Sequence, residues 1–298
     1  MTFIRYFLGA AVRRRRRAAT TPESHSGEKV SIEMFATMKD SVKAIVYTVL
    51  VLLLAVAFSF IPGMNSLLYM LTPTIAVLLM MLVVTRDGYR KEGWKSLGLH
   101  KPGRKGWAFA LIVPAIPLVL SFAVVWLTGM AVVQPGEDFA GFPWPYVPII
   151  LVILYVKAVL IESMGEELGW RGYLLPLLTQ SMNPKAGMLL SGFIHGIWHF
   201  PIIIMTDQYH ADEALWLILP MTVLSTVFLA PVIGQLRLKT GSVWPASMMH
   251  TTHNLVWLVL ATVTADKSEA AKYVSGDMGI VVLLFYIGLT VFMWRKRE

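Results

Sequence analysis

The sequence predicts an all-α protein, a polytopic membrane bundle of about eight transmembrane helices. Of its 298 residues, 56% are hydrophobic and only 15% are charged, whereas a soluble domain carries about 25% charged residues. Apolar stretches of roughly 20 residues recur along the chain, and each can cross a hydrocarbon core of about 30 Å. A large soluble α/β protein is disfavoured, because buried strands do not form uninterrupted apolar runs of this length.

Eight such stretches are expected to cross the membrane, and residues 166–180 should extend the fourth as a helix at the membrane edge. The sixth and seventh are the least distinct pair, because only Arg237, Lys239 and Gly241 divide them. The expected spans lie near residues 42–61, 66–85, 107–129, 146–165, 186–206, 214–236, 242–263 and 278–294.

Positive charge alternates between the loops. The loop 86–105 is rich in Lys and Arg, whereas the loop with Glu137 and Asp138 and the loop 207–213 contain neither residue type. Cytoplasmic loops carry the excess of Lys and Arg. The pattern therefore predicts a multi-pass integral membrane protein with both termini in the cytoplasm, in a prokaryotic plasma membrane.

Residues 1–40 are predicted to form a basic cytoplasmic tail, and residues 41–298 the transmembrane domain. Arg13 to Arg17 follow a short apolar start, the reverse of the order in a secretory signal. Two interpretations stay open: these arginines contact anionic lipid headgroups, at about 1 kcal/mol each, or the tail is solvated. The net charge of +8 lies mainly in this tail and the short loops, so no nucleic-acid partner is expected.

The chain has no cysteine, which excludes disulfides, Cys-ligated zinc and thiol nucleophiles. Ionisable groups inside spans cost about 2.5–3.5 kcal/mol each, so they usually face a partner or a cavity. The first group of them closes the fourth span. Glu167 and Arg171 lie one helical turn apart, in the order that favours an ion pair. Glu166 is turned about 100° from Glu167 and shares a face with Glu162. Taken alone, this pattern is also typical of a solvated helix end.

Two further groups lie in later spans. His195 and His199 share a face of the fifth span, where they could ligate a metal or bond to the backbone. His250 and Asn254 share a face of the seventh span, with His253 beside it. An amide and an imidazole suit stabilisation of an oxyanion, although polar groups also hold membrane helices together. Polar groups in three separate spans favour one shared cavity.

The ordered motifs Glu166-Glu167-x-x-x-Arg171, His199 and His250-x-x-x-Asn254 resemble those of the CPBP family of intramembrane proteases. This family, also called ABI, includes the type II CAAX prenyl endopeptidases and bacteriocin-processing or immunity proteins. The resemblance covers a protease-like core at about 145–263, whereas the first three spans match only in being hydrophobic.

The resemblance implies roles for six residues. Glu166 would activate water near His199, Glu167 and Arg171 would shape the site, and His250 and Asn254 would hold the scissile carbonyl. The cofactor stays unknown: a divalent metal such as zinc could bind Glu166, His199 and His250, or glutamate could act without one.

One position departs from the family pattern. His195 stands where an aromatic residue is usual, and we interpret it as packing or as support for the site. His253 is also additional, and we do not count it as catalytic.

The leading hypothesis is an intramembrane endopeptidase of the metallo or glutamate type, acting on a peptide or a membrane-protein substrate. Glutamate-activated water, reaching the cavity from the cytoplasmic side, would hydrolyse the peptide bond. The alternative is a non-catalytic membrane adaptor or an immunity or regulatory protein on the same fold. An ion-coupled transporter is a third hypothesis, disfavoured because we find no internal repeat.

Overall fold

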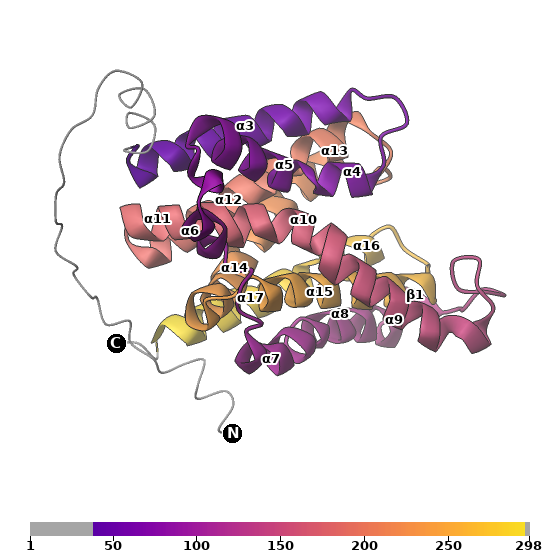
Figure 1. Cartoon of the computed structure of the whole chain (residues 1–298). Coiled ribbons are helices and arrows are strands. Elements are labelled where there is room, and N and C mark those ends of the chain that lie inside the picture. Colours follow the sequence, from indigo (N-terminus) through magenta and orange to yellow (C-terminus); the bar gives the residue numbers. More distant parts are fainter. Residues whose placement is uncertain (1–37, 296–298) are drawn as a thin grey trace, which may run out of the picture.

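The computed structural model describes residues 38–295, and the predicted all-α bundle is confirmed over this range. The predicted contacts of Arg13 to Arg17 fall outside the described residues. Figure 1 shows long helices running side by side, with one small antiparallel pair of strands. The α-helices are α3 (Asp40–Ser59), α4 (Ser66–Met70), α5 (Thr72–Leu79), α6 (Lys91–Ser96), α7 (Trp107–Ile112), α8 (Ala115–Leu127), α9 (Val147–Lys157), α10 (Ser163–Glu167), α11 (Leu175–Ser181), α12 (Pro184–Trp198), α13 (Phe200–Met205), α14 (Leu215–Thr240), α15 (Trp244–Thr262), α16 (Ala271–Val274) and α17 (Ile280–Arg295).

Short segments of other geometry connect these helices. The strands β1 (Ala131–Val133) and β2 (Thr264–Asp266) pair antiparallel. The 3₁₀ turns are η2 (Asp87–Tyr89), η3 (Arg104–Gly106) and η4 (Trp144–Tyr146). The π-helical segments are η1 (Met80–Val84), η5 (Ala158–Glu162) and η6 (Leu168–Leu174).

Six helical stretches of the described chain are long and apolar enough to cross a membrane, and α17 is a shorter apolar helix. The seventh expected span is α15, which has 19 residues but is not among the six. Its His250, His253 and Asn254 lower its hydropathy. All eight expected spans are therefore helical, and one of them is markedly polar. The six stretches are Asp40–Ser59, Ser66–Val84, Arg104–Leu127, Trp144–Ser181, Pro184–Met205 and Leu215–Thr240.

The fourth stretch, Trp144–Ser181, is one continuous helical run, as the predicted extension requires. Its first part is exposed on one side, where Ile149, Val152 and Val156 match the apolar surface of a lipid-facing helix. Every residue from 163 to 175 is buried. The helix therefore passes from the surface of the bundle into its interior at α10.

Two apolar cores lie on either side of this central segment. One joins α3, α5, η6 and α12, with Tyr47 and Trp170 among its largest buried residues. The other joins α7, α8, α14, α15 and α17 around residues such as Met249 and Tyr286. Figure 1 shows these groups as an upper and a lower half of the molecule.

The helices α12 and α14 approach each other closely because glycines face the contact. A Cβ atom on Gly192 would lie 2.5 Å from the Thr226 carbonyl oxygen and 2.7 Å from the Ala230 Cβ. One turn along, a Cβ atom on Gly196 would lie 2.8 Å from the Val223 Cα. Small residues at such contacts let membrane helices pack backbone against backbone. This contact holds α12, which carries His195, against the lower half.

The basic and the acidic loops lie at opposite ends of the bundle. In Figure 1, α6, the start of α7 and the end of α11 lie toward the left, and β1 and α16 lie toward the right. The left end carries the loop 86–105, and the right end carries the loops around Glu137 and Asp212. The predicted alternation of loop charge thus corresponds to two faces of the folded protein.

We expect Gly192→Ala to destabilise the protein and Gly288→Ala to leave its stability unchanged or slightly higher. The new methyl group at 192 has no space, and overpacking of this kind costs about 1–3 kcal/mol. Gly288 is the matched control because it is also helical and nothing lies within 4 Å of an added Cβ. The measurement is the thermal unfolding temperature of both variants in detergent. Equal unfolding temperatures would contradict the close packing of α12 on α14.

Candidate active site

A cavity of about 140 Å³ lies between the two halves of the bundle. It is lined from the upper half by residues such as Tyr69 and Trp198, and from the lower half by Met249 and Tyr286. The six residues that the sequence singled out for the site all line it. These are Glu166, Glu167, Arg171, His199, His250 and Asn254.

The two glutamates lie in α10, in the fully buried part of the continuous helix and between two π-helical segments, η5 and η6. Such wider turns often occur at functional sites, because the extra residue changes which face a side chain occupies. Glu166 is 3% exposed and Glu167 is fully buried. Gly165 permits the close approach of α4, since an added Cβ would lie 2.9 Å from the Met70 carbonyl oxygen.

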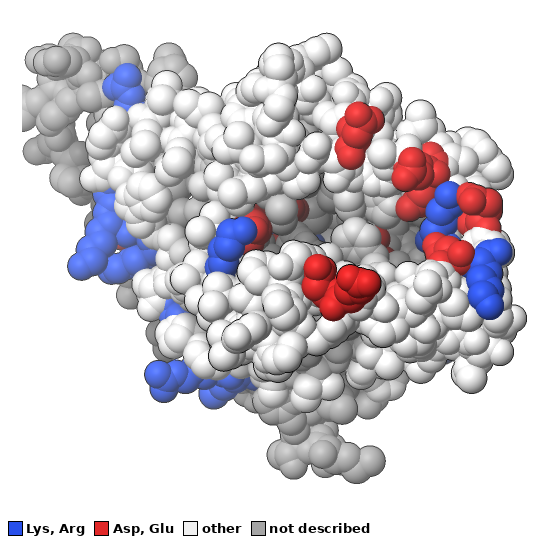
Figure 2. Space-filling view, turned by 90° about the vertical axis from the view of Figure 1, so that its right-hand side faces the viewer, with Lys and Arg blue, Asp and Glu red and all other residues white. Residues whose placement is uncertain are grey.

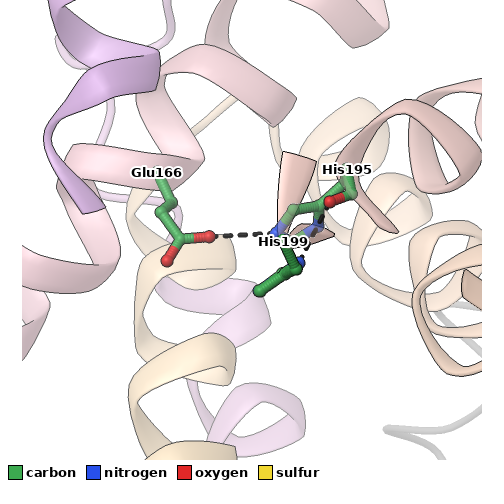
Figure 3. Close-up of side chains that lie close together, drawn as sticks. All are labelled: Glu166, His195 and His199. Atoms are coloured by element: carbon green, nitrogen blue, oxygen red, sulfur yellow. Dashed lines mark hydrogen bonds and ion pairs between the residues drawn. The ribbon is translucent and has the colours of Figure 1, made fainter. Parts of the chain in front are cut away.

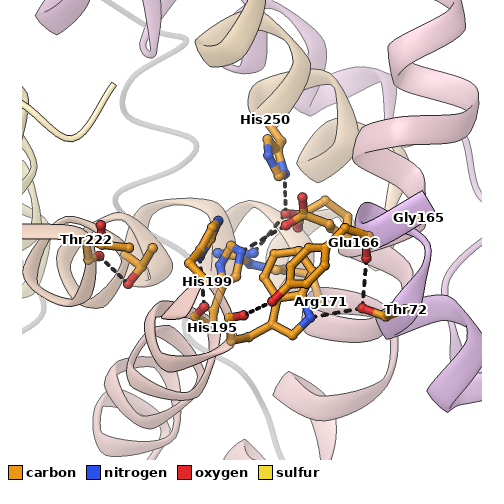
Figure 4. A network of polar contacts seen from close by, with 12 residues as sticks. Thr72, Gly165, Glu166, Arg171, His195, His199, Thr222 and His250 are labelled. Atoms are coloured by element: carbon orange, nitrogen blue, oxygen red, sulfur yellow. Dashed lines mark hydrogen bonds and ion pairs between the residues drawn. The ribbon is translucent and has the colours of Figure 1, made fainter. Parts of the chain in front are cut away.

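Glu167 is held by one cation and one histidine. Arg171 Nη1 lies 2.8 Å from Glu167 Oε1, so the ion pair predicted from their spacing is confirmed. His250 Nδ1 lies 3.0 Å from the same oxygen. Figure 4 shows the His250 ring directed at the glutamates from α15. Because a carboxylate only accepts, His250 donates from Nδ1 and directs Nε2 away from Glu167.

Glu166 contacts the histidines at the end of α12. His195 Nε2 lies 2.9 Å from Glu166 Oε2. His199 Nδ1 lies 3.0 Å from the His195 carbonyl oxygen, so it donates there and leaves the Nε2 lone pair free. Figure 3 shows both rings, one turn apart, beside the carboxylate. The Trp170 ring packs on His195 with 4.8 Å between ring centroids, which fixes the orientation of the imidazole.

The trio Glu166, His195 and His199 could hold a metal ion. One ligand atom from each residue lies within 4.8 Å of the others. Two imidazole nitrogens and a carboxylate oxygen form a donor set that zinc accepts, and the adjoining cavity leaves a further coordination position open. His199 also has the hydrogen-bonded Nδ1 that metal-binding histidines usually show.

This grouping differs from the set predicted from the sequence, which contained His250 in place of His195. His250 lies outside the trio because its Nδ1 is bonded to Glu167. His195, interpreted as packing or as support for the site, both packs on Trp170 and contacts Glu166 directly. The reason is the helical turn of α12, which directs both histidines of the pair toward α10.

The second side of the cavity is formed by α15, where His250 and Asn254 both line the cavity one turn apart. His253 lines it too, but its ring is bonded on both nitrogens. Its Nε2 lies 3.3 Å from the Asp277 carbonyl oxygen, and its Nδ1 lies 3.4 Å from the Tyr286 hydroxyl. These bonds connect α15 to α17 and to the segment before it. They are consistent with a structural role for His253.

A polar cluster at the end of the cavity had no counterpart among the sequence predictions. The Tyr209 hydroxyl donates to Asp277 Oδ2 at 2.5 Å, and the Tyr209 ring lies 5.7 Å from that of His199. His210 Nδ1 lies 2.6 Å from Glu213 Oε1, and its Nε2 lies 3.6 Å from Asp277 Oδ1. Asp277 and Tyr209 lie 68 residues apart in the chain, and no local pattern signals such a pair.

The charges of this cluster stabilise one another. Burial disfavours a charged imidazole, but Asp277 and Glu213 outweigh it and raise the pKa of His210 to about 10. Burial likewise opposes ionisation of Asp277, yet His210 and Tyr209 lower the pKa of its carboxyl to about 2. At neutral pH the two side chains therefore form an ion pair that joins the loops preceding α14 and α17.

The fold and the site define a class, namely polytopic helical membrane proteins with a carboxylate–histidine site inside the bundle. Residues 146–256 match the profile of a family described as type II CAAX prenyl endopeptidase Rce1-like. A CAAX prenyl protease 2 from Methanococcus maripaludis is 28% identical over 129 residues, which cover 39% of this chain and 44% of the relative. The match thus spans less than half the length of that relative.

Both matches are to proteins described as CAAX prenyl endopeptidases or proteases. The matched segment, residues 146–256, extends from η4 into α15 and contains all six residues that the sequence singled out for the site.

The pH dependence of stability should reveal the His210–Asp277 ion pair. The folded pKa of His210, about 10, is above its ordinary value of 6.5. Its contribution to stability is therefore full below about pH 6.5 and is lost as the pH rises toward 10. His210→Asn removes this contribution and suits the backbone, because His210 has φ of 53° and Asn tolerates that conformation.

We expect the wild type to be more stable than His210→Asn at pH 6, with the difference shrinking steadily up to pH 10. The measurement is the unfolding temperature of both proteins in detergent across this range. A difference that stays constant with pH would show that His210 contributes by packing alone.

Proposed function

We propose that the chain is an intramembrane endopeptidase in which Glu166 activates the attacking water. The observation that carries this proposal is the position of Glu166 in the cavity, between the histidines of α12 and the His250–Asn254 pair of α15. A base on one side and hydrogen-bond donors on the other are the groups that addition of water to a peptide carbonyl requires. The family match over 146–256 and the CAAX prenyl protease relative support the same reaction class.

In this mechanism Glu166 accepts a proton from water as the oxygen adds to the scissile carbonyl carbon. The proton later passes to the leaving amine, and the neighbouring His195 orients the carboxylate that carries it. Negative charge develops on the carbonyl oxygen, and Asn254 donates to it from the opposite wall. Donors that are already in place for such a charge are usually a large part of catalysis.

His250 can donate to the oxyanion only as an imidazolium, because its Nδ1 hydrogen is engaged by Glu167. The charges around it are consistent with that form. With Glu166 ionised, as its part as base requires, the two glutamates carry two negative charges, and Arg171 is the one Lys or Arg side chain among the residues lining the cavity. A protonated His250 would make this group neutral. In the proposal, Glu167 and Arg171 therefore act by orienting and balancing His250.

We further propose a metal-dependent form of the site, in which Glu166, His195 and His199 would hold one divalent cation such as zinc in place of the direct His195–Glu166 hydrogen bond. A cation at this place would supply Lewis-acid activation of water. The substrate is a peptide or a segment of a membrane protein that reaches the cavity. Both termini lie in the cytoplasm in this proposal, and the basic tail contacts anionic headgroups.

We expect Glu166→Gln to lower kcat by at least about 100-fold, the lower range of general-base contributions. Glu162→Gln is the matched control: Glu162 is paired with Lys157 at 2.8 Å and does not line the cavity. Cleavage of a quenched-peptide library by purified protein in detergent measures the effect. The unfolding temperatures of both variants verify the fold. Comparable cleavage by Glu166→Gln and wild type would refute the mechanism.

Asn254→Ala should reduce kcat by about 100- to 1000-fold with little change in KM, because it removes a donor used mainly in the transition state. Asn254→Asp should be at least as inactive, since a carboxylate of the same shape accepts instead of donating. Steady-state kinetics on one cleaved peptide measures both. An active Asn254→Asp variant would remove Asn254 from the oxyanion site.

Metal analysis should find about one zinc or similar ion per chain in the wild type and much less in His195→Phe, which restores an aromatic residue at that position. Phe keeps the packing on Trp170 but offers no ligand atom. The measurement is elemental analysis of purified protein, with the unfolding temperature before and after chelation. A wild type that is free of metal and fully active in chelator would leave glutamate as the sole catalyst.

A further inference from the structure

The cavity is walled at one end by residues that come directly from loops or from the first turns after them. Ser66 and Tyr69 belong to the start of α4, just after the turn at 60–65. Tyr209 belongs to the loop between α13 and α14, and Asp277 and Met278 directly precede α17. These segments lie at the end of the bundle that carries β1 and α16 (Figure 1). The cavity therefore extends toward that end.

The opposite end of the site is closed by the basic loop. Arg237 is 7% exposed and donates from Nε to the Arg171 carbonyl oxygen at 3.1 Å and from Nη2 to that of Ser96 at 2.8 Å. Its guanidinium lies against Gly98, where an added Cβ would be 2.9 Å from Arg237 Cζ. Arg237 thus holds the segment 96–101 against the helix that carries Arg171.

Two further bonds complete this closure. Trp244 Nε1 donates to the Leu99 carbonyl oxygen at 2.9 Å, and the Ser242 hydroxyl donates to that of Lys101 at 2.5 Å. No residue of the described loops 86–106 and 241–243 lines the cavity. The cytoplasmic access of water expected from the sequence would have to pass through this bonded layer.

The charges identify the two ends. The closed end carries the basic loop 86–105, and the end toward which the cavity extends carries mostly acidic loops. Figure 2 shows acidic side chains around a hollow on that face. Loops rich in Lys and Arg stay in the cytoplasm, so the hollow lies on the other side of the membrane. The exposed acids of these loops are Glu137, Asp138, Asp207, Asp212, Asp266 and Glu269, beside Lys267 and Lys272.

We propose that the cavity is reached from the acidic, non-cytoplasmic face, and that the protein cleaves exported peptides or extracytoplasmic segments of membrane proteins. The substrate class rests on the proposed peptidase function, whereas the direction of the opening rests on the fold alone. In this proposal free peptides of the cytoplasm are not direct substrates, because the bonded layer of segment 96–101 lies between them and Glu166.

The natural absence of cysteine makes this proposal directly testable, because each introduced thiol is the single one in the chain. Ser66→Cys reports on the mouth and Ser225→Cys on the deep wall, where the Ser225 hydroxyl is buried without a hydrogen-bond partner. Ala270→Cys marks the acidic face and Ser96→Cys the basic face, since both positions are exposed. None of the four belongs to the proposed catalytic group.

The full-length variants are labelled with a charged, membrane-impermeant methanethiosulfonate reagent in right-side-out and in inverted membrane vesicles. We expect the thiols at 66, 225 and 270 to be labelled in right-side-out vesicles and protected in inverted ones, with the opposite result at 96. If the thiols at 66 and 225 were labelled in inverted vesicles and protected in right-side-out ones, as expected for position 96, the proposal would be overturned. It would also be overturned by labelling at 270 from the cytoplasmic side, or by no labelling at 225 in either orientation.

Peptidase activity plays no part in this measurement. A protein that labels as expected but cleaves nothing would refute the proposed function and leave the direction of the opening standing. A protein that cleaves peptides but is labelled at 66 and 225 from the cytoplasmic side would support the proposed function and refute the direction of the opening. The two proposals therefore fail independently.

Discussion

Two adjacent carboxylates lie in the interior of a membrane bundle, where an unpaired charge is far less stable than in water. Glu166 and Glu167 must therefore find partners, and no single helix supplies them all. Arg171 comes from η6, His195 from α12 and His250 from α15. Arg171 belongs to the same continuous helix as α10, whereas His195 and His250 each fix the distance of their own helix from it. The need to pair the two buried carboxylates therefore also determines how α12 and α15 pack against α10.

The rest of the packing serves this arrangement. Glycines bring α12 against α14 and α4 against α10, and so remove the space that side chains would occupy. The Trp198 indole donates to the Thr72 hydroxyl at 3.0 Å, and Tyr69 donates to the Trp198 carbonyl oxygen. These bonds satisfy polar groups that could not meet water in this setting. They also hold the end of α12 rigid, next to His199, so the histidines have little freedom to move away from Glu166.

Interactions within one helix could be predicted from the sequence, and interactions between helices mostly could not. The length of the apolar runs was enough to place the eight expected spans, and helical spacing was enough for the Glu167–Arg171 pair, because both depend on local sequence. The contact of His195 with Glu166 joins residues 29 positions apart, and it depends on how α12 packs. The same holds for Tyr209 with Asp277. The direction of the cavity depends on which loops fold over the bundle, and hydropathy carries no information on that.

The polarity of α15 has a consequence for how the protein is made. A helix with two histidines and an asparagine among its middle residues gains little by entering lipid alone, so its insertion depends on the helices that precede it. The short turn at 241–243 joins it to the apolar α14, and the two can enter as a hairpin. The final wall of the site therefore arrives late in synthesis. Until then Glu167 lacks its bond to His250, and the cavity lacks the wall that α15 forms, so the site is incomplete until α15 is in place.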